Sequence, residues 1–124
     1  MDAVKIYIHK NSTHNQCQIE AKKLNIPFDG IVYASILYML DHGLGIESVT
    51  EFHLSEETRC LYMSEFIANL ISDKAKRLNI SDEYFITLCL SQILWCNNYA
   101  DTIREYYYNR KLDDGSARKI SKTK

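Results

Sequence analysis

The segment AKKLNIPFDGIVYASILYML at residues 21–40 aligns with AKRLNISDEYFITLCLSQIL at residues 75–94 when the chain is shifted against itself by 54 positions. Six of these 20 positions are identical and six more are similar in size or charge, whereas ordinary residue usage gives about one identity. In both copies a helix-like segment ends in Leu-Asn-Ile, a short break follows, and a second apolar segment begins. The repeat predicts a chain built from two related units.

Capping and turn signals delimit the helices of the first unit. Thr13 and Gln16 have the spacing of a capping box, which predicts a helix that ends near Asn25. The Ile-Pro step that follows cannot continue a helix. A second helix is predicted over residues 28–42, with Gly43 placed just after its C-terminus.

The second unit carries matching helix signals. Apolar residues recur with helical period over residues 64–78, and a turn is predicted at residues 79–82. From Phe85 onward, apolar residues at spacings of three and four predict a last helix that continues to about residues 106–108. The Asp-Asp-Gly sequence at residues 113–115 stops it.

Strand signals precede each pair of helices. Near the N-terminus, period-two alternation predicts a half-buried strand with Val4, Ile6 and Ile8 on one face and Lys5, Tyr7 and His9 on the other. At the repeat offset, residues 59–63 are a candidate second strand. The sequence equally allows one continuous helix over residues 55–78, starting at Ser-Glu-Glu.

The predicted fold is therefore mainly α: a short N-terminal strand plus two related helix-turn-helix hairpins, the alternative being an all-α helical bundle. One compact domain is expected over residues 1–110, made of units 3–43 and 55–110. The tail at residues 111–124 carries five positive and two negative charges. It is either a solvated end or an electrostatic arm for nucleic acid.

Strand, helix, tight turn and helix in about 45 residues resemble the ribbon-helix-helix family of DNA-binding proteins, the Arc and MetJ type. The stretch LYMSEFIANLISDKAKRLNIS at residues 61–81 is similar to that family's strand end and first helix. The resemblance implies that the two strands pair into an antiparallel ribbon that enters the major groove of double-stranded DNA. It also implies base-reading side chains and a phosphate contact; the readers would be Lys5, Tyr7, His9 and Arg59, with Lys10 near a phosphate.

The chain departs from that family at two places. The parity of the second strand slips by one position relative to the first, which would exchange its buried and exposed faces. The second helix of each unit begins with acids, Asp29 in one unit and Asp82 with Glu83 in the other. These carboxylates would repel a phosphate from the helix N-terminus.

A different class of function is also open, a helical adaptor or inhibitor that binds another protein. Its candidate surfaces are an acidic middle segment that includes Glu56 and Glu57, and a Tyr-rich segment that includes Tyr106 and Tyr107. Tyrosine is enriched at interfaces. The same rings could instead pack on the preceding helices.

Composition and charge exclude several further classes of protein. The net charge is -1, so no global field steers the chain toward nucleic acid or membrane. No apolar run is long enough to span a bilayer, and the N-terminus lacks an apolar signal segment. The four cysteines form no CxxC pair. We expect a non-enzymatic protein without metal or cofactor, monomeric or homodimeric, in the cytoplasm of a cell or of an infected host.

Overall fold

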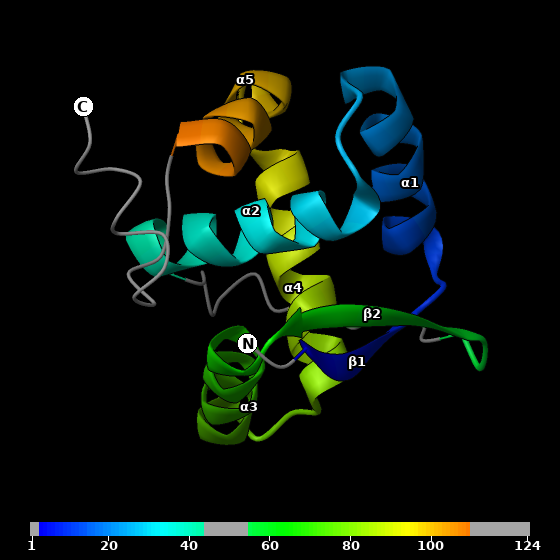
Figure 1. The fold of residues 1–124 in the computed structure, drawn as a ribbon, viewed down its shortest axis with the longest axis vertical. Helices are drawn as coiled ribbons and strands as arrows, with labels where there is room; N and C mark the ends of the chain where they lie inside the picture. Colours follow the sequence, from blue (N-terminus) through cyan, green and yellow to red (C-terminus); the bar gives the residue numbers. More distant parts are fainter. Residues whose placement is uncertain (1–2, 44–54, 110–124) are drawn as a thin grey trace.

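The structure of the protein, a computed structural model, describes residues 3–43 and 55–109. A strand and two helices are followed by a second strand and two helices, and a short helix and a π-helical turn come last (Figure 1). The bounds are β1 (Ala3–His9), α1 (Ser12–Leu24), α2 (Phe28–His42), β2 (Thr58–Ser64), α3 (Glu65–Leu78), α4 (Asp82–Trp95), α5 (Tyr99–Arg104) and η2 (Glu105–Asn109). The predicted mainly α fold with a repeated β-α-α unit is confirmed.

The two strands pair in antiparallel register and form a two-stranded ribbon. Ile6 lies opposite Leu61, at the middle of a ladder that extends three residues to either side. Residues 58–64 are thus a strand with every second central side chain buried. The alternative of one helix over residues 55–78, with its start at residues 55–57, is wrong, because extended backbone there completes the hydrogen bonding of β1.

β1 and β2 share one pattern of exposure. In each strand the fourth and sixth residues are buried, while the third and fifth are exposed. Equivalent strand residues are therefore 55 positions apart, as Ile6 and Leu61 are. The ends of the first helices are 54 apart, since Asn25 corresponds to Asn79. The second unit has one residue fewer than the first between its strand and the end of the following helix. This difference produces the predicted slip of one position between the strand offset and the helix offset.

The identical residues of the repeat form the same helix C-terminus twice. Asn25 and Asn79 both adopt the left-handed conformation, with φ of 58° and 60°. In the first unit the backbone N–H of Ile26 donates to the Ala21 carbonyl oxygen at 3.0 Å, and the second unit repeats this bond at the same distance. Asparagine tolerates this conformation better than most residues. The Leu-Asn-Ile sequence is therefore a turn signal as well as a sign of duplication.

The predicted helix starts are only partly correct. Asn11, not Thr13, caps α1, and its side-chain oxygen accepts the His14 backbone N–H at 3.1 Å. Ser64 caps α3 in the same way, through Ile67 N at 3.2 Å. At the other end of the first unit, α2 ends at Gly43 with φ of 76°, as predicted.

The core lies between the second helices of the two units. α2 and α4 pack against each other, and α4 also packs on β1, α1 and α3. Nine of the 15 residues of α2 and seven of the 14 residues of α4 are buried. The inner face of the ribbon adds four side chains to this core: Ile6, Ile8, Leu61 and Met63. Neither β-α-α unit has a separate core, because each strand and each second helix is buried against the other unit.

The last predicted helix is interrupted. α4 ends at Trp95, and Asn98 adopts a left-handed conformation with φ of 57°. The chain turns there, and α5 and η2 pack on α2 (Figure 1). Residues 85–108 are therefore not one continuous helix, because a continuous helix would carry the terminal tyrosines away from α2. The basic tail at residues 111–124 lies outside the described residues.

Gly30 in α2 gives a test of this packing. A Cβ at Gly30 would lie 2.6 Å from Cε1 of Tyr107 and 3.0 Å from Cγ2 of Ile26. In an open helix the Gly-to-Ala change stabilises by up to about 1 kcal/mol. We expect Gly30→Ala to destabilise instead, by about 1–3 kcal/mol, as measured by urea unfolding.

The double variant Gly30→Ala/Tyr107→Ala provides the control. Removal of the Tyr107 ring takes away the contact at 2.6 Å and leaves Cγ2 of Ile26, at 3.0 Å, as the nearest of the remaining atoms. The Gly30→Ala change should then cost clearly less than in the otherwise native chain. An equal cost in both backgrounds would refute the described packing of η2 on α2.

Candidate nucleic-acid interface

The outer face of the ribbon is the surface that the helices leave uncovered. Strand alternation places one set of side chains there from each strand: Ala3, Lys5, Tyr7 and His9 from β1, and Thr58, Cys60, Tyr62 and Ser64 from β2. Tyr7 is 44% exposed and Tyr62 is 57% exposed. Two aromatic rings and one lysine therefore project from this face, and the described strand residues on it include no carboxylate.

Cross-strand pairs arrange these side chains in rows. Lys5 lies opposite Tyr62, and Tyr7 lies opposite Cys60. Directly opposed residues have their Cβ atoms about 5 Å apart, so the lysine and the two rings form a contiguous patch. The structure places Lys5 and Tyr7 on the outer face, where the sequence predicted them to be.

His9 and Lys10 lie where β1 ends. His9 is half-buried, and its Nδ1 donates to the Ser55 carbonyl oxygen at 2.6 Å, since a carbonyl can only accept. Lys10 follows the strand with an exposed side chain, while its backbone N–H donates to the Glu57 carbonyl oxygen at 2.9 Å. The His9 side chain is thus held by a hydrogen bond within the protein. The Lys10 side chain, in contrast, is exposed to solvent beside the ribbon.

Arg59 does not lie on the outer face, so its predicted position as a base reader is wrong. Its guanidinium carbon lies 4.2 Å from the centroid of the Phe28 ring. Its Nη1 also donates to Oε1 of Gln18 and lies 3.5 Å from Nε2 of His14. The prediction failed because it carried the helix offset of 54 into the strand, which aligns Arg59 with Lys5. The strands are related by an offset of 55, which aligns Arg59 with inward-facing Val4.

Sequence reasoning missed the outward residues of β2. Tyr62, Cys60 and Thr58 hold the places equivalent to Tyr7, Lys5 and Ala3. The signal that could have found them is the pair of apolar residues in Leu-Tyr-Met, which brackets an outward Tyr62 in the same way that Ile-Tyr-Ile brackets Tyr7.

A polar hollow lies beside one end of the ribbon, between β2 and α1. Residues from both elements and Lys10, which precedes α1, line it: Lys10, His14, Asn15, Gln18, Ile19, Thr58, Arg59 and Cys60. A second hollow shares Gln18 and Arg59 and extends to Lys22 and the start of α2. Lys10, Lys22 and Arg59 thus bring three positive charges to neighbouring surfaces, an arrangement suited to an anion such as a phosphate.

His14 is neutral at pH 7 in this surrounding. Burial lowers its pKa from the ordinary 6.5, and Arg59 and Lys10 lower it further, partly offset by the hydrogen bond to Asn15. Nδ1 lies 2.9 Å from the Asn15 side-chain oxygen and therefore carries the proton. Nε2 is left as an acceptor facing Arg59.

Acids stand at the starts of α2 and α4, as the sequence indicated. Asp29 lies in the first turn of α2, and Asp82 and Glu83 lie in the first turn of α4. Asp82 also accepts a hydrogen bond from the Ser72 hydroxyl at 3.2 Å. These carboxylates make the helix N-termini poor places for a phosphate.

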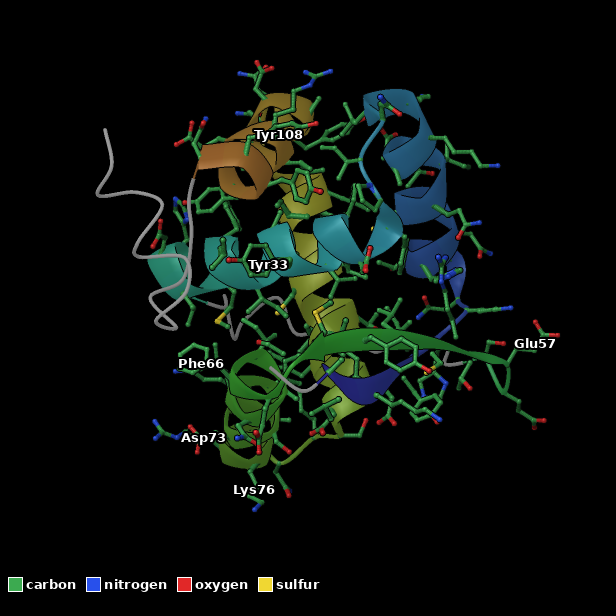
Figure 2. All side chains as sticks on the ribbon, viewed as in Figure 1. Tyr33, Glu57, Phe66, Asp73, Lys76 and Tyr108 are labelled. Carbon is green, nitrogen blue, oxygen red and sulfur yellow. The ribbon has the colours of Figure 1, made fainter. Side chains whose placement is uncertain are left out.

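The alternative protein-binding residues divide into two groups. Glu56 and Glu57 are exposed, and Figure 2 shows Glu57 at the end of the ribbon. Tyr106 is only 6% exposed, and its hydroxyl donates to Oδ2 of Asp41 at 2.8 Å. Tyr107 packs over Gly30. The sequence left open whether these rings bind a partner or pack on the preceding helices. In the structure, Tyr106 and Tyr107 pack on α2.

Two of the four cysteines, Cys17 and Cys89, are buried free thiols. Burial raises the pKa of the Cys17 thiol to about 12 and also raises that of Cys89, so both thiols stay protonated at neutral pH. Within residues 3–43 and 55–109 no three His, Cys, Asp or Glu residues are grouped as metal ligands would be.

Comparisons with protein-family models, with curated proteins and with solved structures find no match to this chain. In the described part of the chain, no helix combines the length and apolar character needed to cross a membrane.

The neutral state of His14 gives a pH-dependence prediction. A folded pKa below 6.5 means that the unfolded chain binds more protons, so stability falls as the pH drops below 6.5 and through the folded pKa. NMR titration should place the His14 pKa below 6.5, and Arg59→Ala should raise it, since a nearby positive charge is lost. The variant His14→Gln should lose less stability on acidification than the native chain. A His14 pKa above 6.5 would contradict this assignment.

Proposed function

We propose that this protein binds double-stranded DNA by inserting the β1–β2 ribbon into the major groove. The observation that carries the proposal is a two-stranded antiparallel ribbon whose inner face is buried by helices and whose outer face exposes Lys5, Tyr7 and Tyr62. The major groove, about 12 Å wide, admits a two-stranded ribbon. In this proposal the chain is a single-chain counterpart of the ribbon-helix-helix family that it resembles.

The chemistry of the outer face supports this function. Lysine donates to O6 and N7 of guanine, and tyrosine combines a hydroxyl donor with an apolar ring that can contact a thymine methyl group. The ribbon is held from behind by the buried side chains of Ile6, Ile8 and Leu61. A rigid support of this kind suits base reading, because few side chains need to be ordered on binding.

Phosphate contacts would come from the side of the ribbon. Lys10 and Lys22 are exposed, and Arg59 lies between the two hollows that they line. Such contacts position a protein on the duplex, whereas outer-face contacts provide the specificity. In a cell the activity would be that of a transcriptional repressor or of a plasmid- or phage-type accessory factor.

Substitutions on the outer face test the proposal directly. We expect Lys5→Ala and Tyr7→Ala each to weaken binding to a selected duplex by about 5- to 150-fold, the range for loss of one good base contact. Both side chains are exposed, so the thermal midpoint should change little. Fluorescence anisotropy with a labelled duplex measures the affinity, and unchanged affinity in both variants would contradict the proposal.

The salt dependence of binding separates phosphate contacts from base contacts. Each neutralised phosphate contributes about -0.9 to the slope of log K against log salt. We expect Lys10→Ala and Lys22→Ala each to reduce the steepness of that slope by about 1. The matched control is Lys76→Ala, because Lys76 is the repeat equivalent of Lys22 but lies at the far end of α3 from the ribbon (Figure 2).

Failure to bind any duplex at low salt would overturn the proposal. The helical interaction function predicted from the sequence would then be the remaining candidate, with Glu56 and Glu57 exposed for it. Charge reversal at these two residues, and not at Lys5, should then weaken binding of a partner.

A further inference from the structure

The pairing of the strands is symmetric about the Ile6–Leu61 pair. Because equivalent residues are 55 positions apart, a two-fold rotation through that pair exchanges β1 and β2. In a homodimer such a rotation would relate identical side chains, and the preferred DNA site would be a palindrome. Here the rotation relates different residues.

Three of the four outer pairs differ in chemistry. The equivalent positions are Ala3 and Thr58, Lys5 and Cys60, Tyr7 and Tyr62, and His9 and Ser64. Lys5 offers a charged donor, whereas the thiol of Cys60 is a weak one. Only the tyrosines are the same. The two halves of the ribbon therefore present different donors and acceptors to the two halves of a duplex site.

The two ends of the ribbon also differ in charge. Lys10 follows β1 directly, whereas Glu65 follows β2 directly. Arg59 stacks on Phe28 at the start of α2, whereas its strand equivalent is Val4. The helix equivalent of Phe28, 54 positions on, is Asp82.

Other charged residues also distinguish the two ends of the ribbon. Lys22 and Lys23 in the last turn of α1 correspond to Lys76 and Arg77 in the last turn of α3, but Lys22 lines a hollow with Arg59, whereas Lys76 lies at the far end of α3 from the ribbon (Figure 2). Glu56 and Glu57 are the acids beside Lys10, and Glu57 lies at the tip of the ribbon (Figure 2). The end that carries Lys10 and Arg59 thus also has Glu56 and Glu57 nearby, whereas the other end carries Glu65 and, at the start of α4, Asp82. The cations that a phosphate could contact at these strand and helix junctions therefore lie at the first end.

We propose that the ribbon reads a non-palindromic duplex site in a single orientation, with the end that carries Lys10 and Arg59 held on the DNA backbone. The proposal rests on the proposed DNA-binding function and defines its ligand class. One protein molecule occupies one site, and the Lys5 half and the Cys60 half of the ribbon prefer different bases.

Selection from a duplex library with a random segment about two helical turns long tests the proposal. The full chain should recover a motif that is not self-complementary. Two artificial palindromes, each made from one half of that motif and its inverted copy, should bind about 5- to 150-fold more weakly, because one half then loses its contacts. Repeating the selection with Lys5→Ala should relax base preference in one half only.

The variant Cys60→Lys makes the ribbon more symmetric. It should tighten binding to the palindrome built from the half that Lys5 reads, relative to the native motif. Ser64 is left unchanged because it caps α3. Asn69→Lys is the matched control: it adds the same charge at an exposed position of α3 and should not change the ratio between the two duplexes.

The other possible results of these experiments separate the site proposal from the DNA-binding proposal. Recovery of a palindrome, or of no preferred sequence despite tight binding, would refute the non-palindromic site while leaving DNA binding in place. Retention of no duplex at low salt would refute the proposed function itself and the inference with it. An unchanged ratio in Cys60→Lys would refute the assignment of the two halves to Lys5 and Cys60.

Discussion

The pairing of β1 with β2 is the interaction on which the rest of the structure depends. One strand and two helices cannot bury enough apolar surface to fold alone, and an isolated two-stranded ribbon is marginal in water. Joining Ile6 to Leu61 closes a long loop, whose entropic cost grows only slowly with length. In return, the ribbon gives the two apolar second helices a common surface to pack on. The two units therefore fold as one.

Comparison of the two units shows which positions are fixed by the fold and which are not. The buried inner strand positions hold apolar residues in both units, Ile6 and Ile8 in β1 and Leu61 and Met63 in β2, because these side chains pack in the core. The left-handed helix ends hold Asn25 and Asn79, because few residues tolerate that conformation. Outer strand positions obey neither constraint, and three of the four differ between the units. That divergence makes the two halves of the outer face chemically different.

Much of the fold was predictable because it is encoded by local sequence. The turn after Asn79, the end of α2 at Gly43 and the alternation of β1 all follow from neighbouring residues. Residues 55–64 were not predictable, since acids followed by mixed apolar residues suit a helix or a strand, and only hydrogen bonding to β1 decides between them. The turn at Asn98 was hidden by apolar spacing that continues through it.

The candidate site, like the fold, was predictable from the sequence only in part. The sequence alone determined that a helix-turn-helix pattern is duplicated, and that Lys5 and Tyr7 share a strand face opposite the apolar one, because helix period, turn residues and alternation within one strand are local properties. The tertiary structure decided which face of β2 is outward, and so brought Tyr62 to the surface and turned Arg59 onto Phe28. It also decided that Tyr106 is buried against α2. These outcomes depend on pairing and packing between residues far apart in the chain, which local periodicity does not specify.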